Sequence, residues 1–219
     1  MPGKSREVAC MPELHNLIMF AAASALLALA PGPDNIFVLT QSILSGAAAG
    51  FRVTLGLCTG LVVHTAVVTL GVAAVFQTSL LAFNMLKYCG AAYLLYLAWQ
   101  AFRASSEKIE IGEKKDLTPW QLYRRGIIMN ATNPKVSLFF IAFLPQFTSP
   151  EKGRLPLQMV LLGVIFAVIT VIVFGLISRL AGYVGAWINR SKRGGAMLNR
   201  AAGTVFASLA VKLILTERM

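Results

Sequence analysis

Charged side chains are scarce in this chain. Only 13% of its 219 residues are Asp, Glu, Lys or Arg, against about a quarter in an ordinary soluble domain. The shortage is concentrated, because residues 53–76 and 155–178 include no such side chain, and each stretch exceeds the ~20 residues that cross a bilayer core. The sequence therefore predicts an integral membrane protein, with no polar segment long enough to fold as a second domain.

Cysteine and histidine are equally few. Cys10, Cys58 and Cys89 show neither paired spacing nor a CxxC motif, so the sequence indicates no disulfide framework and no metal site. It also contains no HExxH motif, no GxSxG motif and no mid-segment pair of carboxylates. A membrane-embedded enzyme is therefore disfavoured, and we expect no cofactor.

Acidic residues are outnumbered by basic ones, nine to 20, which gives a net charge of +11. A basic chain can bind nucleic acid. Here, however, the Lys and Arg residues lie mostly between apolar segments, where membrane proteins carry their orientation signals. We therefore expect the lipid bilayer as a partner and no nucleic acid.

A proline-rich interruption stands out against this apolar background. Pro31, Gly32 and Pro33 lie inside the apolar run 17–44, and Asp34 is the only charge of that run. Proline and glycine do not continue an α-helix, and non-helical backbone at membrane depth persists only where it is buried or lines a cavity. The sequence thus predicts a broken first span with a carboxylate at the break. Asp34 acts there as a first-turn acid of the restarting helix, as a functional carboxylate, or as both.

A second interruption, Asn133-Pro134-Lys135, lies in the apolar part of a later segment. Lys135 is the only charge between residues 127 and 147. It either extends along its helix towards the interface or pairs with Asp34 or with a substrate carboxylate, and we favour pairing because unpaired charges at depth are costly. Asn133 either caps the restart of the helix or hydrogen-bonds substrate.

The fold class that follows is all-α, with six transmembrane helices. Residues 87–93 and 200–206 align without gaps, with a basic residue, a glycine and an aromatic in register. Because each half has an odd number of spans, the halves predict two inverted three-helix repeats, with helices 1 and 4 broken by proline. The expected parts are an N-terminal tail (1–14), a first repeat (15–103), a charged linker (104–119) and a second repeat (120–219).

Orientation follows from the basic residues. Twelve of the Lys and Arg residues lie in the connections after the first, third and fifth spans, and seven lie on the other side. The positive-inside rule then predicts a cytoplasmic linker 104–119 and periplasmic termini. Met1 and Met11 are both candidate starts of the chain.

Several motifs together resemble a known family. They are PGPD at 31–34, GFR at 50–52, GAAYLLYLAW at 90–99, and NPK at 133–135 followed by FFIAFLPQF at 139–147. In this order they resemble the lysine exporter family of amino-acid efflux carriers. The resemblance implies export of amino acids or related metabolites across a bacterial inner membrane, coupled to proton entry.

For such a carrier, matching breaks in the two halves indicate the substrate site. The candidate substrate-binding residues are Gly32, Asp34, Asn35, Asn133 and Lys135. Carbonyls freed beside Gly32 are expected to accept from an ammonium, and N–H groups from about Asn35 to donate to an α-carboxylate. A broken helix provides both polarities within a few Å, as a zwitterionic amino acid requires.

Proton coupling is assigned to Asp34 and His64. His64 shares a helix face with Gly56 and Gly60, whose small size allows close helix approach. A lone histidine on such a face is more often a hydrogen-bonded packing residue than a proton relay, although histidine readily changes its charge near neutral pH.

Two rival functions stay open. One is a carrier of another small zwitterionic or amine-bearing metabolite on the same scaffold. The other is a channel or redox-partner subunit, but a channel does not need paired, inverted helix breaks. A homodimer formed through exposed apolar faces is compatible with the sequence, which gives it no specific support.

Overall fold

The computed structural model describes residues 11–30, 32–72, 80–103, 117–181, 183 and 192–215. Within these ranges the chain is helical with short connections, and none of the described residues forms a β-strand. The predicted all-α class is therefore confirmed for this part of the chain. Pro31, most of the N-terminal tail and most of the charged linker lie outside the described residues.

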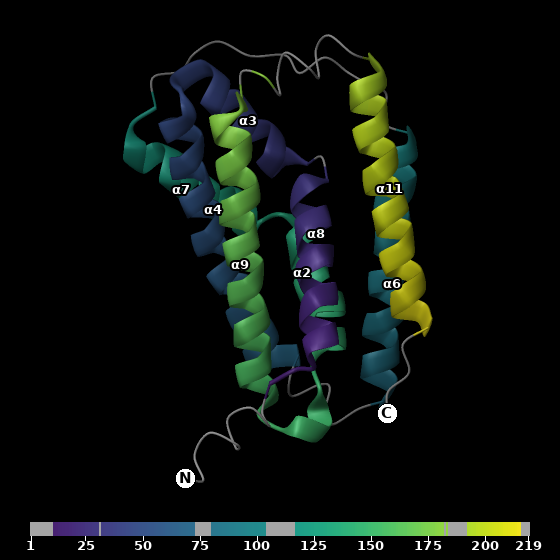
Figure 1. The fold of residues 1–219 in the computed structure, drawn as a ribbon. Coiled ribbons are helices and arrows are strands. Elements are labelled where there is room, and N and C mark those ends of the chain that lie inside the picture. Colours follow the sequence, from purple (N-terminus) through teal and green to yellow (C-terminus); the bar gives the residue numbers. More distant parts are fainter. Residues whose placement is uncertain are drawn as a thin grey trace.

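The elements of the two halves follow one another in a similar order. The first half contains α2 (Leu14–Leu29), α3 (Pro33–Ser45), α4 (Ala47–Val67), the π-helix η1 (Val68–Val72) and α6 (Leu80–Arg103). The second contains α7 (Pro119–Ala131), α8 (Pro134–Leu138), the π-helix η2 (Phe139–Phe143), the 3₁₀ turns η3 (Leu144–Phe147) and η4 (Pro150–Lys152), α9 (Leu155–Arg179) and α11 (Lys192–Leu215). Successive long segments run in opposite directions (Figure 1).

Two helices are long and apolar enough to cross a membrane, the stretch Ala47–Gly71 and α9. The number of candidate spans in the described residues rises to four if each bent pair counts as one. These pairs are α2 with α3, bent by 60°, and α7 with the segment Pro134–Phe147, bent by 49°. The 24-residue helices α6 and α11 are long enough for a crossing, although their composition is less apolar.

Both predicted breaks are present. Pro33 and Pro134 each occupy the first turn of a restarting helix, where the missing N–H costs nothing. Between α2 and α3, Ala30 and Gly32 have extended backbones. The broken segments occupy the middle of the molecule: α2 contacts α9 on one side and α11 on the other, while η2 contacts both α4 and α6 (Figure 1).

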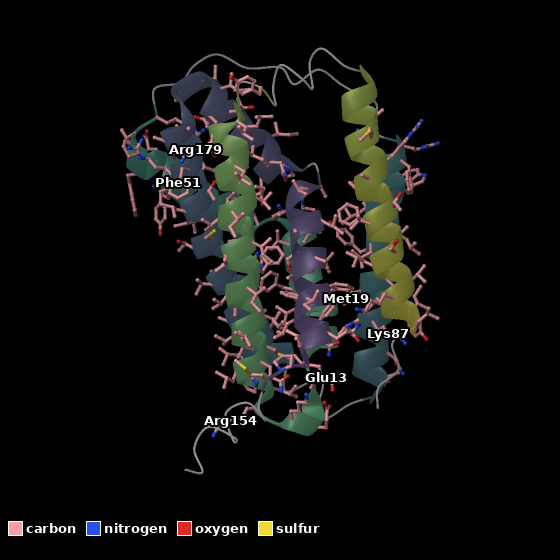
Figure 2. The ribbon with its side chains drawn as sticks, in the orientation of Figure 1. Glu13, Met19, Phe51, Lys87, Arg154 and Arg179 are labelled. Atoms are coloured by element: carbon pink, nitrogen blue, oxygen red, sulfur yellow. The ribbon has the colours of Figure 1, made fainter. Side chains whose placement is uncertain are left out.

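The α6–α11 pair stands beside this centre. Lys87 on α6 donates to the carbonyl of Ile214 at the end of α11, with 3.0 Å between nitrogen and oxygen. Lys87 lies near the lower end of the pair (Figure 2). Gly203 faces Phe102 of α6, whereas Gly90, which the sequence alignment of the two halves puts in register with it, lies closest to Ala142 of η2 and then to Leu213 of α11.

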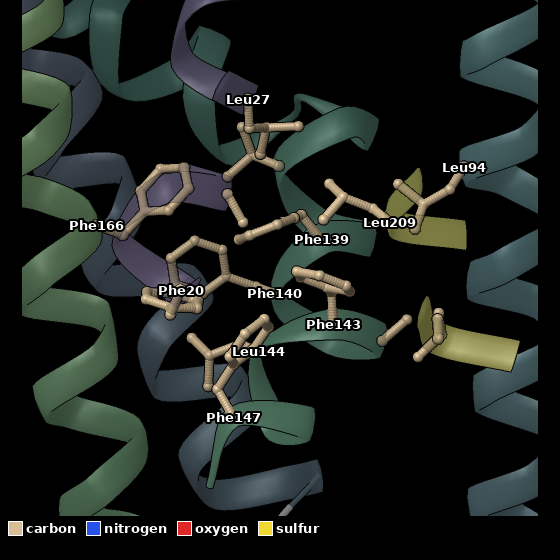
Figure 3. Close-up of a cluster of buried hydrophobic side chains, with 14 of the residues drawn as sticks. Phe20, Leu27, Leu94, Phe139, Phe140, Phe143, Leu144, Phe147, Phe166 and Leu209 are labelled. Carbon is tan, nitrogen blue, oxygen red and sulfur yellow. The ribbon is translucent and has the colours of Figure 1, made fainter. Parts of the chain in front are cut away.

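A buried aromatic cluster fills the space below the breaks (Figure 3). Its rings come from Phe20 of α2, Phe166 of α9 and four positions of the second broken segment: Phe139, Phe140, Phe143 and Phe147. Several pairs meet edge to face, such as Phe143 and Phe147 with ring centroids 4.9 Å apart. Pro145 follows η2 and cannot donate a helical hydrogen bond, which accounts for the irregular winding here.

Helices α4 and α7 cross at very close range. A Cβ built on Gly126 would lie 2.3 Å from the carbonyl oxygen of Val53, and one on Gly56 would lie 2.0 Å from that of Tyr123. Further along, Gly60 faces Asn130. The predicted use of small residues for close helix approach on this face is therefore confirmed.

We predict that Gly126→Ala destabilises the protein. The added methyl group meets backbone atoms that cannot rotate away, so overpacking should cost about 1–3 kcal/mol. The measurement is the melting temperature in detergent. Gly175→Ala is the control, since its nearest neighbour is 3.8 Å from the added carbon; equal melting temperatures for the two variants would contradict the close crossing.

Candidate functional site

The two helix breaks meet in the interior. The Nδ2 amide of Asn133 donates to Oδ2 of Asp34 across 2.8 Å, and both residues are only 3% exposed. Asp34 lies in the first turn of α3, while Asn133 is the N-cap of α8, where its Oδ1 accepts from the Lys135 N–H at 3.0 Å. The expected proximity of the breaks is thus confirmed, and Asn133 both caps its helix and bridges to Asp34.

The ammonium of Lys135 lies at the end of α2. It donates to the carbonyl oxygen of Ala30 at 3.0 Å and to that of Leu27 at 3.3 Å. These carbonyls belong to the last turn of a helix. Carbonyls there have no intrahelical donor and carry the partial negative charge of the helix C-terminus. The freed carbonyls therefore hold an ammonium, as expected, but in this structure it is the chain's own.

Gly32 provides the space for this contact. A Cβ at Gly32 would lie 3.0 Å from Nζ of Lys135, so a larger residue would press on the ammonium. Lys135 itself is buried, and its inward hydrogen bonds show that it does not extend to the interface.

The opposite charges at the junction do not form a direct ion pair. Among the described residues, Asp34 and Lys135 interact electrostatically while each hydrogen-bonds to a different group, the Asn133 amide and the α2 carbonyls respectively. The expected pairing of Lys135 with Asp34 is therefore indirect. The Asp34 carboxylate can therefore still accept a further hydrogen bond.

Three acceptor oxygens at the junction are buried without a hydrogen-bond partner among the described residues: the Oδ1 atoms of Asp34, Asn35 and Asn130. Asp34 and Asn130 line a cavity of about 20 Å³, room for a single water molecule. Asn130 is absent from the predicted site residues. Its spacing, one helical turn before Asn133 in the same broken segment, is the signal that indicates it.

The rest of the cavity wall is apolar apart from one hydroxyl and the ammonium. The full lining is Leu27, Ala28, Asp34, Asn130, Lys135, Val136, Phe166, Thr170 and Phe174. Leu27, Val136 and Phe166 belong to the aromatic cluster of Figure 3, whereas Ala28 and Phe174 belong to a second apolar cluster around α3, α4 and α7. The cavity therefore lies between two apolar layers.

Asn35 and His64 lie beside the cavity rather than in its wall. The Asn35 amide donates to the Ala28 carbonyl across 2.5 Å, which ties α3 back to α2. Nε2 of His64 lies 2.9 Å from the carbonyl oxygen of Asn130; since a carbonyl only accepts, the imidazole donates. His64 is thus a hydrogen-bonded packing residue that also acts electrostatically on Asp34, and its relay role stays a prediction.

Comparison with known proteins identifies the family. Residues 25–217 match the family model described as LysE type translocator. The chain belongs to this family. The matched region includes both helix breaks and every residue of the junction, so the similarity to the lysine exporter family is confirmed, and this translocator is a membrane transporter rather than an enzyme.

Relatives of the translocator match it over most of their length. A homoserine/homoserine lactone efflux protein of Salmonella typhimurium is 37% identical over 187 residues, 85% of this chain and 90% of its own. The protein of that name from Salmonella typhi matches equally well. An uncharacterized membrane protein of Pseudomonas aeruginosa is 32% identical over 192 residues, covering 84% and 88% of the two chains. No solved structure matches this translocator.

We predict that exchanging the two bridging residues preserves the junction. Asn133→Asp alone places two carboxyl groups face to face and removes a charge-assisted hydrogen bond, which should cost about 1.5–3 kcal/mol. Asp34→Asn/Asn133→Asp restores one amide and one carboxylate, and Asp is a good N-cap for α8. Melting temperatures in detergent should fall for the single variant and recover in the double; additive losses would exclude the direct contact.

Proposed function

We propose that this translocator exports an amino acid or a small amino-acid derivative from the cytoplasm and binds it at the junction of the two broken helices. The observation that supports this most directly is the chemistry of the cavity. Unpaired acceptor oxygens of Asp34 and Asn130 lie near the buried ammonium of Lys135. A zwitterion presents the complementary groups, an ammonium for the oxygens and a carboxylate for Lys135.

In the proposed mechanism, substrate binding breaks the contact between Lys135 and the end of α2. Lys135 holds the end of α2 through the carbonyls of Leu27 and Ala30. A substrate carboxylate competes for the same ammonium, and its full negative charge attracts Lys135 more strongly than the partial charge of a carbonyl oxygen does. Transfer of Lys135 to the substrate would free α2 from α8, so occupancy of the site would be coupled to movement of the broken helix.

The small size of the cavity suggests where this conformation lies in the proposed transport cycle. A space of about 20 Å³ is far too small for an amino acid, so the described conformation is a closed one. We infer that the two apolar clusters act as alternating barriers, one separating at a time. The supporting pattern is reciprocal packing: α4 of the first half contacts α7 of the second, and α9 of the second contacts α2 of the first, as six crossings in two inverted repeats would arrange them.

Proton entry is the proposed driving force, with Asp34 as the carrier. A carboxylate that loses its substrate ammonium in a closed, apolar site is costly to leave charged, and protonation would relieve that cost on the return step. His64, hydrogen-bonded to the backbone of Asn130, is the proposed neighbour through which the proton passes. We place the protein in a bacterial inner membrane with cytoplasmic linker 104–119 and periplasmic termini, as the basic residues indicate.

The substrate side chain would face α9. The polar groups of the cavity come from α3, α7 and α8, and the wall opposite comes from Phe166, Thr170 and Phe174 at successive turns of α9. Thr170 donates its hydroxyl hydrogen to the Phe166 carbonyl at 2.8 Å, so its oxygen can still accept. A short side chain with a hydroxyl group fits such a wall, and homoserine, named in the relatives from Salmonella, is of this kind.

We predict that Asp34→Asn lowers export 10- to 100-fold. The amide keeps the size of the side chain but loses a charged contact of about 1.5–3 kcal/mol with the substrate ammonium. The assay is counterflow in proteoliposomes with a panel of amino acids, with and without a pH gradient. Glu13→Gln, the same chemical change at an exposed position, should leave the rate unaltered. Wild-type rates and pH dependence for Asp34→Asn would refute the assigned role.

We predict that Thr170→Val changes selectivity rather than the overall rate. Valine has the same shape without the acceptor oxygen, so uptake of homoserine should fall about five-fold relative to an apolar amino acid of equal length, the effect of one lost hydrogen bond. Competition between the two substrates in the same counterflow assay measures this ratio. An unchanged ratio would show that Thr170 of α9 takes no part in substrate recognition. If another amine-bearing metabolite were transported faster than every amino acid of the panel, the rival substrate class would be favoured.

A further inference from the structure

A lengthwise groove runs along the outer surface where α4 and α9 meet. Its volume is about 400 Å³, and its lining is almost entirely apolar: Cys58, Leu61, Val62, Thr65, Ala66, Thr69, Leu70, Val160, Gly163, Val164 and Ala167. The two helices that form it are the most convincing membrane-crossing helices of the chain. Acyl chains therefore surround this groove in the native setting.

Thr69 breaks the apolar character of the groove. Its hydroxyl oxygen is buried and has no hydrogen-bond partner among the described residues. The three threonines of the preceding helix α4, at positions 54, 59 and 65, each donate to the carbonyl four residues earlier. Thr69 lies in the π-helix η1, which begins where the N–H of Val68 is shared between the carbonyls of His64 and Thr65.

An unsatisfied hydroxyl is costly where no water can reach it. An acceptor carried by a largely apolar molecule that fills the rest of the groove would satisfy this hydroxyl. Such molecules surround the protein: the ester carbonyl of a phospholipid is an acceptor attached directly to an acyl chain.

The depth of Thr69 agrees with this partner. It shares the groove with Val160, which lies six residues after Arg154 at the charged start of α9, and so lies near the boundary where ester carbonyls are found. From Thr69 the groove extends back to Cys58, about 17 Å along the helix, close to the ~15 Å of hydrocarbon in one leaflet.

Basic residues stand at the same end. Lys152 and Arg154 directly precede α9, and Arg154 lies at the lower end of the molecule, below the start of that helix (Figure 2). Val160 in the groove lies less than two helical turns from Arg154, so a phosphate group beyond the ester carbonyl would approach the Arg154 guanidinium. Lys152 at this end is paired with Glu13, with 3.6 Å between nitrogen and oxygen.

We propose that this groove is a specific phospholipid site, in which the Thr69 hydroxyl donates to an ester carbonyl and one acyl chain lies between α4 and α9. The site does not depend on the transported substrate. It makes a bound lipid part of the α4–α9 contact, where it satisfies a group that the π-helix leaves without a partner.

The test compares dioleoyl phosphatidylglycerol with its diether analogue, which lacks both carbonyls but has the same chains and headgroup. Delipidated protein in detergent is titrated with each lipid, and bound lipid is counted by native mass spectrometry. Wild type should bind the diester about five-fold more tightly, the effect of one hydrogen bond. Thr69→Val should bind both lipids equally, at the affinity of wild type for the diether.

Thr65→Val is the matched control, because it makes the same change in the same groove at a hydroxyl already bonded to Leu61. It should keep the five-fold preference. Equal binding of the two lipids by wild type, or a preference that survives Thr69→Val, would overturn the proposal. Val164→Trp, at a position exposed along the groove, should weaken binding of both lipids by filling the space, and unchanged binding would also overturn it.

Discussion

The hydrogen bond between the Asn133 amide and the Asp34 carboxylate is the constraint on which the interior depends. It joins residues 99 positions apart and fixes two interrupted helices against each other at their weakest points. Interrupted backbone is tolerated in an apolar surrounding only when its polar groups find partners. Here each break supplies what the other lacks, since the first presents freed carbonyls and a carboxylate, while the second presents an amide and an ammonium.

The polar groups of this junction satisfy one another only in part. Lys135 is satisfied by backbone oxygens, so it does not neutralise Asp34 by direct contact. Within the described part of the chain, the Oδ1 atoms of Asp34, Asn35 and Asn130 have no donor to accept from. Buried polar groups of this kind are rare in native proteins and usually have a reason. On the proposed function, the reason is a substrate that supplies the missing donors only while it is bound.

The sequence was informative about positions and less so about partners. Proline chemistry placed both breaks, and the i, i+4 spacing placed Gly56, Gly60 and His64 on one face, because these rules act within a few residues. The partner of Lys135 was not predictable, since the α2 carbonyls compete with Asp34 and only the bend of the helix decides between them. The site role of Asn130 was overlooked although it lies one helical turn before Asn133, because only the tertiary contact between the breaks shows that this turn faces Asp34. The π-helices arise where tertiary packing and Pro145 override regular winding.

The glycine contact between α4 and α7 has a consequence for how such a protein can move. Where the backbones of α4 and α7 touch at Gly56 and Gly126, no side chains lie between them that could repack. The two helices are therefore expected to move together. Yet α4 precedes the charged linker and α7 follows it. A rocking motion would therefore carry α4 and α7 together, although the two helices belong to different halves of the chain.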